Sequence, residues 1–111
     1  MINKGEIVNE ECLYPIKSTL AVISSKWTLL ILRDIAISTK RFGQLQKSLK
    51  GISPKTLSSR LQELERAGII SRKIYPEVPP RVEYSLTSQG DSLKTIILSL
   101  AEWGKEHLTD K

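Results

Sequence analysis

The sequence predicts a winged helix-turn-helix, a mainly α-helical fold with a small β-hairpin as its wing. Two helical segments, expected at about residues 41–49 and 54–67, are separated by a short turn that contains Gly51. After Gly68 the spacing of apolar residues changes from about 3.6 to about 2, which indicates a change from helix to strand. Two such strands flank a stiff, proline-rich tip, and this pattern predicts a hairpin over about residues 70–86.

Two helices are expected before this unit. Pro15 suits the first turn of a helix, where its missing N–H group is not needed, so the first helix is expected to begin there. Apolar residues then follow at helical spacing, at Ile16, Leu20 and Ile23. A second helix is expected from Lys26 to about Ala36, with Ser25 as its N-cap. Residues 38–40 are interpreted as a polar connection to the helix-turn-helix.

The second helix of the pair has the clearest start signal in the sequence. Ser53 is a good N-cap, because its hydroxyl oxygen can accept a hydrogen bond from a free N–H of the first turn. Pro54 follows at the first helical position. Ile52 and Leu57 flank this start and can form a hydrophobic staple, which fixes the direction in which the chain enters the helix. Ser53 and the first-turn N–H groups are also well placed to bind a phosphate.

The polar face of this helix carries the candidate base-reading residues. The buried stripe on the other face consists of Leu57, Leu61 and Leu64. With Leu57 at zero and about 100° per residue, the side chains at about 140–200° point away from the core, and these are Lys55, Ser59 and Gln62. A recognition helix places such residues at base edges in the major groove. The candidates are therefore Lys55, Thr56, Ser59 and Gln62, with an ordinary solvated polar face as the alternative interpretation.

Positive charge is concentrated on the same part of the chain. The formal net charge is +5, but residues 40–81 hold ten basic and three acidic residues, a local charge of +7 that leaves −2 for the rest. A concentrated positive field suits a polyanion, because each neutralised phosphate releases condensed counterions. Arg41, at the start of the first helix of the pair, is one of these basic residues and is counted among the expected DNA contacts.

Two further arginines have alternative interpretations. Arg60 lies at the border of the apolar stripe, where it can reach a phosphate or pair with a nearby carboxylate such as Glu63. Arg81 follows the rigid Pro79-Pro80 tip of the hairpin. Its side chain can enter a narrow minor groove, as arginines do in A·T tracts, or it can be a solvated loop charge. The proline brace favours the minor-groove interpretation.

The chain of 111 residues fits one small domain. Its weakly patterned start, residues 1–11, is expected to form an N-terminal arm, and residues 12–108 are expected to form one winged-helix domain for DNA binding and dimerisation. The last helix is expected after Thr87, which can act as its N-cap. An apolar stripe follows between Leu93 and Leu108. Because an uncovered stripe of that length would be a liability, a dimer interface is favoured over an intradomain core.

No catalytic, metal or cofactor site is predicted, and the protein is not expected to be an enzyme. The single cysteine, Cys12, and the single histidine, His107, are too far apart in the sequence for metal-ligand spacing. No glycine-rich phosphate loop and no nucleophile–base arrangement is present. One cysteine cannot form an intrachain disulfide, and the simplest interpretation is a reducing cytoplasm. Neither a secretion signal nor a membrane span is predicted.

The leading hypothesis from these residues is sequence-specific binding of double-stranded DNA by a dimer. The alternative is a winged-helix module that binds another protein and has no sequence-specific DNA binding, since a fold does not fix a function.

Strings from both halves of the chain carry a family resemblance. They are Lys26-Trp27, Leu29-Leu30-Ile31-Leu32, Arg41-Phe42, Gly51-Ile52-Ser53, Arg60-Leu61, Leu64-Glu65, Gly68-Ile69-Ile70, Pro79-Pro80-Arg81-Val82-Glu83-Tyr84, Leu86-Thr87, Gly90 and Trp103. In these strings the sequence resembles the HxlR-type transcriptional regulators, a branch of the MarR-like winged-helix proteins. The resemblance covers roughly residues 12–108, and the strings at the start of the recognition helix and in the wing are specific.

The resemblance implies a homodimer, formed mainly by the N-terminal and C-terminal helices, that binds palindromic operator DNA. The expected interface residues are Tyr14, Ile16, Leu93, Ile96, Ile97, Leu100, Trp103 and Gly104. Carry-over of the family pattern also puts Lys55, Thr56, Ser59 and Arg60 on the recognition helix and Arg81 on the wing. It points to no particular effector.

Cys12 departs from the family pattern. Many members have a cysteine immediately before the proline of the first helix, and some sense oxidants through it, but here Tyr14 occupies that place. A thiol can act as a redox switch where it is exposed and its pKa is lowered. A small buried apolar residue is the commoner role of a free cysteine, so redox sensing by Cys12 is the weaker of the two hypotheses.

Overall fold

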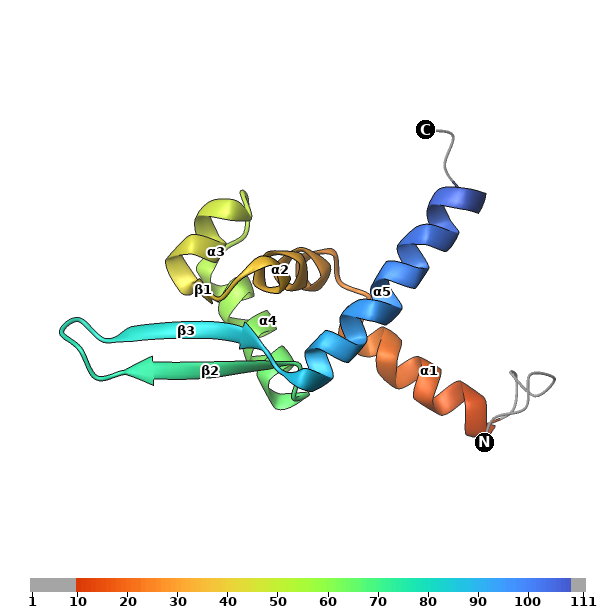
Figure 1. The fold of residues 1–111 in the computed structure, drawn as a ribbon, viewed down its shortest axis with the longest axis horizontal. Coiled ribbons are helices and arrows are strands. Elements are labelled where there is room, and N and C mark those ends of the chain that lie inside the picture. Colours follow the sequence, from red (N-terminus) through yellow and green to blue (C-terminus); the bar gives the residue numbers. More distant parts are fainter. Residues whose placement is uncertain (1–9, 109–111) are drawn as a thin grey trace.

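The computed structural model describes residues 10–108, which form helices and strands in the order expected for a winged helix-turn-helix (Figure 1). The elements are α1 (Glu10–Ile23), α2 (Lys26–Ile37), β1 (Lys40–Arg41), α3 (Phe42–Ser48), α4 (Pro54–Arg66), β2 (Ile70–Tyr75), β3 (Arg81–Leu86) and α5 (Ser88–His107). The predicted fold class is confirmed, with α3 and α4 as the helix-turn-helix and β2–β3 as the wing.

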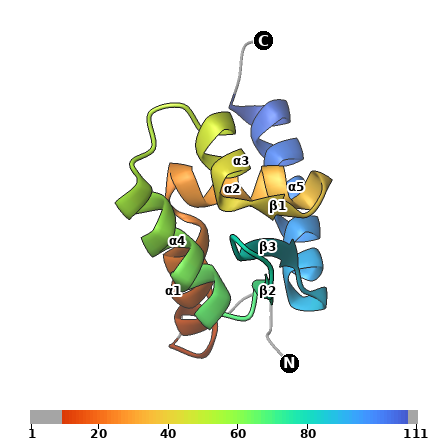
Figure 2. The same ribbon diagram turned by 90° about the vertical axis from the view of Figure 1, so that its left-hand side faces the viewer.

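The molecule is elongated, and its two halves differ in character. The hairpin projects from one end, whereas α1 and α5 leave the other end and diverge as the two arms of a V (Figure 1). Seen from the hairpin end, α4 lies beside the hairpin (Figure 2). The helix-turn-helix and the wing therefore share one half of the molecule, opposite the V.

The turn and the start of α4 form as their residues predict. Gly51 has a φ of +94°, a left-handed conformation that favours glycine, and it ends the α3 segment. The Oγ of Ser53 then accepts a hydrogen bond from the backbone N–H of Thr56 at 3.0 Å, with Pro54 at the first helical position. At the other end of α4, Gly68 has a φ of +77° and turns the chain into β2.

The core lies between α2, α3, α4 and the sheet. Its fully buried side chains are Ile31, Leu45, Leu57, Leu61, Leu64 and Ile70. The three leucines of α4 recur at helical spacing, so one face of this helix is buried as predicted. Burial of each such side chain contributes about 1.5–3 kcal/mol, which holds α4 rigidly against α2 and α3.

The sheet has β3 at its centre, with β1 and β2 on either side. In the β2–β3 pair Ile70 lies opposite Leu86, and Arg72 lies opposite Tyr84. The interpretation of residues 38–40 as a plain polar connection was incomplete, because Lys40 and Arg41 form the short strand β1. The second edge of β3 supplies the hydrogen-bond partners that this segment needs as it enters α3.

The expected start of the first helix was wrong, because α1 begins at Glu10 and contains Pro15. Pro15 lacks the N–H that would donate to the carbonyl of Glu11. Glu11 is exposed, so water can satisfy that carbonyl, and the turn before the proline keeps its helical path. Glu10 and Glu11 thus belong to α1 and not to an arm. Residues 1–9, the rest of the predicted arm, lie outside the described residues.

The helix N-caps at Ser25 and Thr87 differ in chemistry. Ser25 is the N-cap of α2 by position, but its hydroxyl makes no capping hydrogen bond. The hydroxyl of Thr87 accepts from the N–H of Gly90 at 3.0 Å, as expected for the cap of α5. Gly90 itself is buried against the carbonyl of Ile69, so α5 begins in close contact with the start of β2.

Candidate nucleic-acid interface

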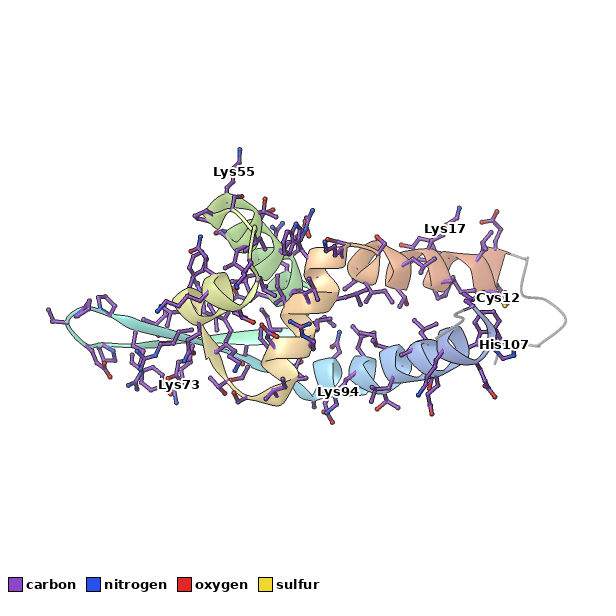
Figure 3. The ribbon with its side chains drawn as sticks, turned by 90° about the horizontal axis from the view of Figure 1, so that it is seen from above. Cys12, Lys17, Lys55, Lys73, Lys94 and His107 are labelled. Carbon is purple, nitrogen blue, oxygen red and sulfur yellow. The ribbon has the colours of Figure 1, made fainter. Side chains whose placement is uncertain are left out.

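On the polar face of α4, the three side chains predicted to point away from the core are exposed to solvent. Lys55, Ser59 and Gln62 are exposed, on the side of the helix opposite its buried leucines. Lys55 stands on the first turn and points away from the rest of the molecule (Figure 3). The predicted outward direction of these three side chains is therefore confirmed, and they are accessible to a ligand.

Ser53 and Thr56 are engaged with each other. The Ser53 Oγ accepts from the Thr56 N–H at 3.0 Å and lies 2.9 Å from the Thr56 Oγ1, to which it donates. Thr56 is half-buried, whereas Ser53 is exposed. These hydroxyls hold the first turn of α4 in place.

Of the two alternatives for Arg60, a phosphate contact or an ion pair with a nearby carboxylate, the structure has the ion pair. Its guanidinium lies 3.1 Å from the carboxylate of Glu63, one helical turn further on. The arginine side chain is partly buried along the apolar border of α4, which the angular position predicts.

Arg81 matches neither of its two interpretations fully. It begins β3, and its guanidinium lies 3.1 Å from Glu77 and 3.3 Å from Glu83. The same group stacks on the ring of Tyr75, 3.9 Å from the ring centroid. With 28% of its side chain exposed, Arg81 is an organised part of the wing and not a solvated loop charge. Its expected entry into a minor groove stays a prediction.

The other basic residues of this region have no carboxylate partner among residues 10–108. The three acidic residues of the 40–81 stretch pair with Arg60, Arg72 and Arg81. The seven remaining cations are Lys40, Arg41, Lys47, Lys50, Lys55, Arg66 and Lys73. All but the half-buried Lys40 are exposed. An uncompensated positive surface therefore runs over α3, the turn, α4 and the wing.

Five of these cations, Lys40, Lys47, Lys50, Arg66 and Lys73, were not singled out as site residues. The count of basic residues in the 40–81 stretch included them. A count cannot show which of these basic residues pair with a carboxylate. Arg41, which was singled out, is the N-cap of α3, and its N–H donates to Gln44 Oε1 at 2.8 Å. Its exposed side chain adds to the same surface.

The base of the wing is tied to α4 by an ion pair. Arg72 on β2 lies 3.7 Å from Glu65 of α4. Beside it in the sheet, burial raises the pKa of the Tyr84 phenol, an effect that Arg72 opposes and Glu65 reinforces. The phenol therefore stays neutral, and Lys73 is the wing's only contribution to the seven cations without a carboxylate partner among residues 10–108.

The V between α1 and α5 is lined by apolar side chains. A groove of about 480 Å³ lies there, with walls that include Cys12, Ile16, Leu20, Ile96 and Leu100. The predicted interface residues Tyr14, Ile16, Ile96, Leu100 and Trp103 are exposed. Leu93 and Ile97 pack partly against the core of their own chain. Four further apolar residues of α1 and the α5 segment are exposed but were not among the predicted interface residues: Leu13, Leu20, Leu98 and Leu108.

Cys12 is 2% exposed and lies in the wall of this groove. Such burial fits the packing role of a cysteine better than the exposed environment of a reactive thiol. Redox sensing through Cys12 stays a prediction.

Two classes of site are missing from residues 10–108. These residues contain no cluster of three or more histidine, cysteine or acidic side chains that could hold a metal ion. In the same range, no helix combines the length and the hydropathy that crossing a membrane requires.

Comparisons with known proteins agree with this architecture. An HTH-type transcriptional regulator of Synechocystis sp. is 43% identical over 94 residues, which are 85% of this chain and 70% of that protein. A MarR-family transcriptional regulator from Enterococcus faecalis V583 superposes with a TM-score of 0.81 and 35% identity, covering 94% of this chain and 93% of the other. The redox regulator HypR in its reduced form gives a TM-score of 0.77 and 39% identity, over 83% of this chain and 91% of that one.

The family profile described as HxlR-like helix-turn-helix matches residues 22–111, most of the chain. This match confirms the resemblance that the sequence strings indicated. The chain belongs to the HxlR-like helix-turn-helix family and is a transcriptional regulator with a helix-turn-helix domain.

Proposed function

We propose that the protein binds double-stranded operator DNA as a homodimer, with α4 in the major groove and the β2–β3 wing at the minor groove. The observation that carries this proposal is the surface of seven cations over β1, α3, α4 and the wing that have no carboxylate partner among residues 10–108. Such a surface attracts phosphates along its whole length and releases their counterions. The proposed action is binding, with no catalytic step.

In this proposal Lys55, Ser59 and Gln62 read base edges, since they stand on the free face of α4. Lysine can donate to guanine acceptors, and glutamine can pair with adenine. Ser53 and Thr56 hold the first turn, whose N–H groups and helix dipole suit a phosphate. Arg60, which is paired with Glu63, contributes to the backbone contact only if it exchanges that carboxylate for a phosphate.

A second copy of the chain is the proposed occupant of the V. The exposed apolar residues of α1 and α5 line a groove that is too large to be left open to water in a chain of 111 residues. Two-fold symmetry would then place two copies of α4 on the same side of the dimer, which suits a palindromic operator.

The test of DNA binding begins with selection of bound sequences from a random duplex pool at physiological salt. We expect an inverted repeat with half-sites about 10 bp, or a multiple, from centre to centre. The selected site and a scrambled duplex are then titrated by fluorescence anisotropy with the Lys55→Ala variant. A loss of about 1–3 kcal/mol on the selected site alone is expected. The matched control is Lys17→Ala, on an exposed lysine of α1 in the other half of the molecule (Figure 3).

Equal losses of the Lys55 variant on the selected and scrambled duplexes would contradict base reading by Lys55. A protein without affinity for any duplex at low salt would overturn the whole proposal and support the alternative, a protein-interaction module.

The dimer is tested by sedimentation of a Leu100→Glu variant, which puts a charge into the wall of the V. We expect monomers that keep low-salt binding to random duplex and lose the selected palindrome. Thr95→Glu, on the opposite side of the same helix, is the matched control and is expected to stay dimeric. A dimer that persists in the Leu100 variant would show that another surface joins the two copies.

A further inference from the structure

The start of α2 carries a lysine that lies outside the charge-rich stretch of residues 40–81. Lys26 is the first residue of α2, and its side chain is exposed. It forms no ion pair with a carboxylate within residues 10–108. Figure 3 shows that α2 begins on the side of the molecule to which Lys55 points. Lys26 therefore adds a further cation to the side on which α4 is proposed to meet DNA.

A lysine is an unfavourable residue for this position of a helix. The N-terminal end of a helix carries a partial positive charge, so acidic residues stabilise the first turn and basic residues oppose it. The first turn of α2 contains no acidic residue, and the hydroxyl of Ser25 makes no capping hydrogen bond. An external phosphate beside Lys26 would turn this unfavourable arrangement of charge into a favourable one. Residues that break a local rule of this kind are expected at functional positions.

Trp27 connects Lys26 to the turn of the helix-turn-helix. The ammonium of Lys26 lies over the indole ring, with its Nζ 5.4 Å from the ring centroid. The ring also reaches the turn, because its Cη2 atom lies 4.0 Å from the position that a Cβ would occupy on Gly51. Lys50, the residue before Gly51, is exposed and belongs to the seven cations of the proposed DNA surface. The indole ring thus holds Lys26 next to the turn that precedes α4.

We propose that Lys26 contacts a phosphate of the DNA backbone and that Trp27 is its positioning residue. This inference rests on the proposed binding of DNA by α4. The contact reads no base, because a lysine ammonium binds a phosphate as a point charge whatever the sequence. Its effect is to fix the register and orientation of α4 on the duplex. Lys50 in the turn and Lys26 at the start of α2 would then hold the backbone beside the first turn of α4.

The test measures the salt dependence of DNA binding by fluorescence anisotropy, on the selected operator and on a scrambled duplex. Lys26→Gln is expected to lower the slope of log K against log salt by about 0.9 for each chain, and by the same amount on both duplexes. The expected loss of affinity is at most about fivefold for each chain, as for one exposed charge pair.

Two variants serve as controls for this measurement. Lys26→Arg is expected to keep the parent salt slope, because it retains the positive charge at the same position. Lys94→Gln makes the same change in net charge on α5, on the side of the molecule away from Lys55 (Figure 3). It is also expected to keep the parent slope, since its charge is screened from the duplex.

A second measurement uses Trp27 itself. The chain has two tryptophans, so Trp103→Phe leaves Trp27 as the only one. Trp27 is half-buried beneath the exposed Lys26, and a duplex that contacts Lys26 would cover the accessible part of its ring. We expect the operator to reduce acrylamide quenching of the Trp27 emission in the Trp103→Phe protein, with folding checked by circular dichroism.

The inference is overturned if Lys26→Gln keeps the parent salt slope. It is also overturned if Lys94→Gln lowers the slope as much, since the loss would then come from net charge alone, or if the operator leaves the quenching of Trp27 unchanged. In each of these cases the parent protein still binds the operator, so the proposed function stands. A parent protein without affinity for either duplex would overturn the proposed function and this inference together.

Discussion

Arg81 offers the sharpest test of how the wing meets DNA, through the two carboxylates that hold it. The guanidinium lies 3.1 Å from Glu77 and 3.3 Å from Glu83, so these three groups together carry a charge of about −1. In that state these three groups together repel a phosphate. The perturbation is Glu77→Gln combined with Glu83→Gln, which leaves Arg81 stacked on Tyr75 and raises the local charge to about +1.

The expected gain follows from the exposure of these side chains. Arg81 is 28% exposed, and its partners are 48% and 24% exposed, so solvent screens both pairs. Each such pair contributes about 0.2–1 kcal/mol. In the parent protein Arg81 must give up both pairs to contact a phosphate, so their removal is expected to lower the free energy of operator binding by about 0.4–2 kcal/mol. Operator binding is therefore expected to tighten by about 2- to 30-fold. One new phosphate contact also steepens the salt dependence of log K by about 0.9.

The assay is fluorescence anisotropy on the selected operator at several salt concentrations. Glu102→Gln combined with Glu106→Gln is the matched control, because it makes the same change in net charge on exposed positions of α5. That control is expected to change the affinity little, since its charges lie beyond a Debye length from the wing. The reasoning is refuted if the wing variant keeps the parent salt slope, or if the α5 control tightens binding equally.

Three further predictions concern stability and Cys12. Gly90→Ala is expected to destabilise the fold by about 1–3 kcal/mol in urea unfolding, because the new Cβ would lie 2.1 Å from the carbonyl oxygen of Ile69. An unchanged midpoint would mean that α5 is not held so closely. Ser53→Ala is expected to cost about 1 kcal/mol through loss of the α4 cap, whereas Ser59→Ala stays near neutral. The buried Cys12 is expected to react slowly with a thiol reagent and to give the same chain mass with and without reductant. Rapid reaction would favour the redox hypothesis.

The sequence predicted the helix-turn-helix well because its signals are local. Ser53, Pro54 and Gly51 fix a cap, a first turn and a helix end within a few residues, and the structure has all three. The strand β1 had no such signal, because two residues form a strand only when β3 lies beside them. The predicted start of α1 was wrong because Pro15 is a local signal that allows a helix to begin but does not require it. Here the helix continues through the turn before it, where the exposed Glu11 lets water satisfy the carbonyl that Pro15 leaves unpaired.

The same distinction applies to the candidate site. The free face of α4 follows from about 100° per residue, which is a property of any helix. The state of each cation does not follow from the chain alone. Arg60 has its partner three residues away, and this pairing was anticipated, but Arg81 is held by Glu77 across the hairpin turn and by stacking on Tyr75. Those contacts depend on the register of β2 and β3, which places Tyr75 opposite Arg81.

The joint between the wing and α5 links the two proposed binding surfaces. Thr87 donates from its hydroxyl to the carbonyl of Gly68 and from its N–H to that of Ile69, and the side-chain amide of Gln89 donates to Ala67 at 2.9 Å. With Gly90 packed on Ile69, the first turn of α5 is thus fixed to the end of α4. The direction of α5 sets the V, and the V is the proposed dimer contact. The distance between the two recognition helices in such a dimer therefore depends on this joint as much as on the contact itself, so the half-site spacing of the operator reports on both.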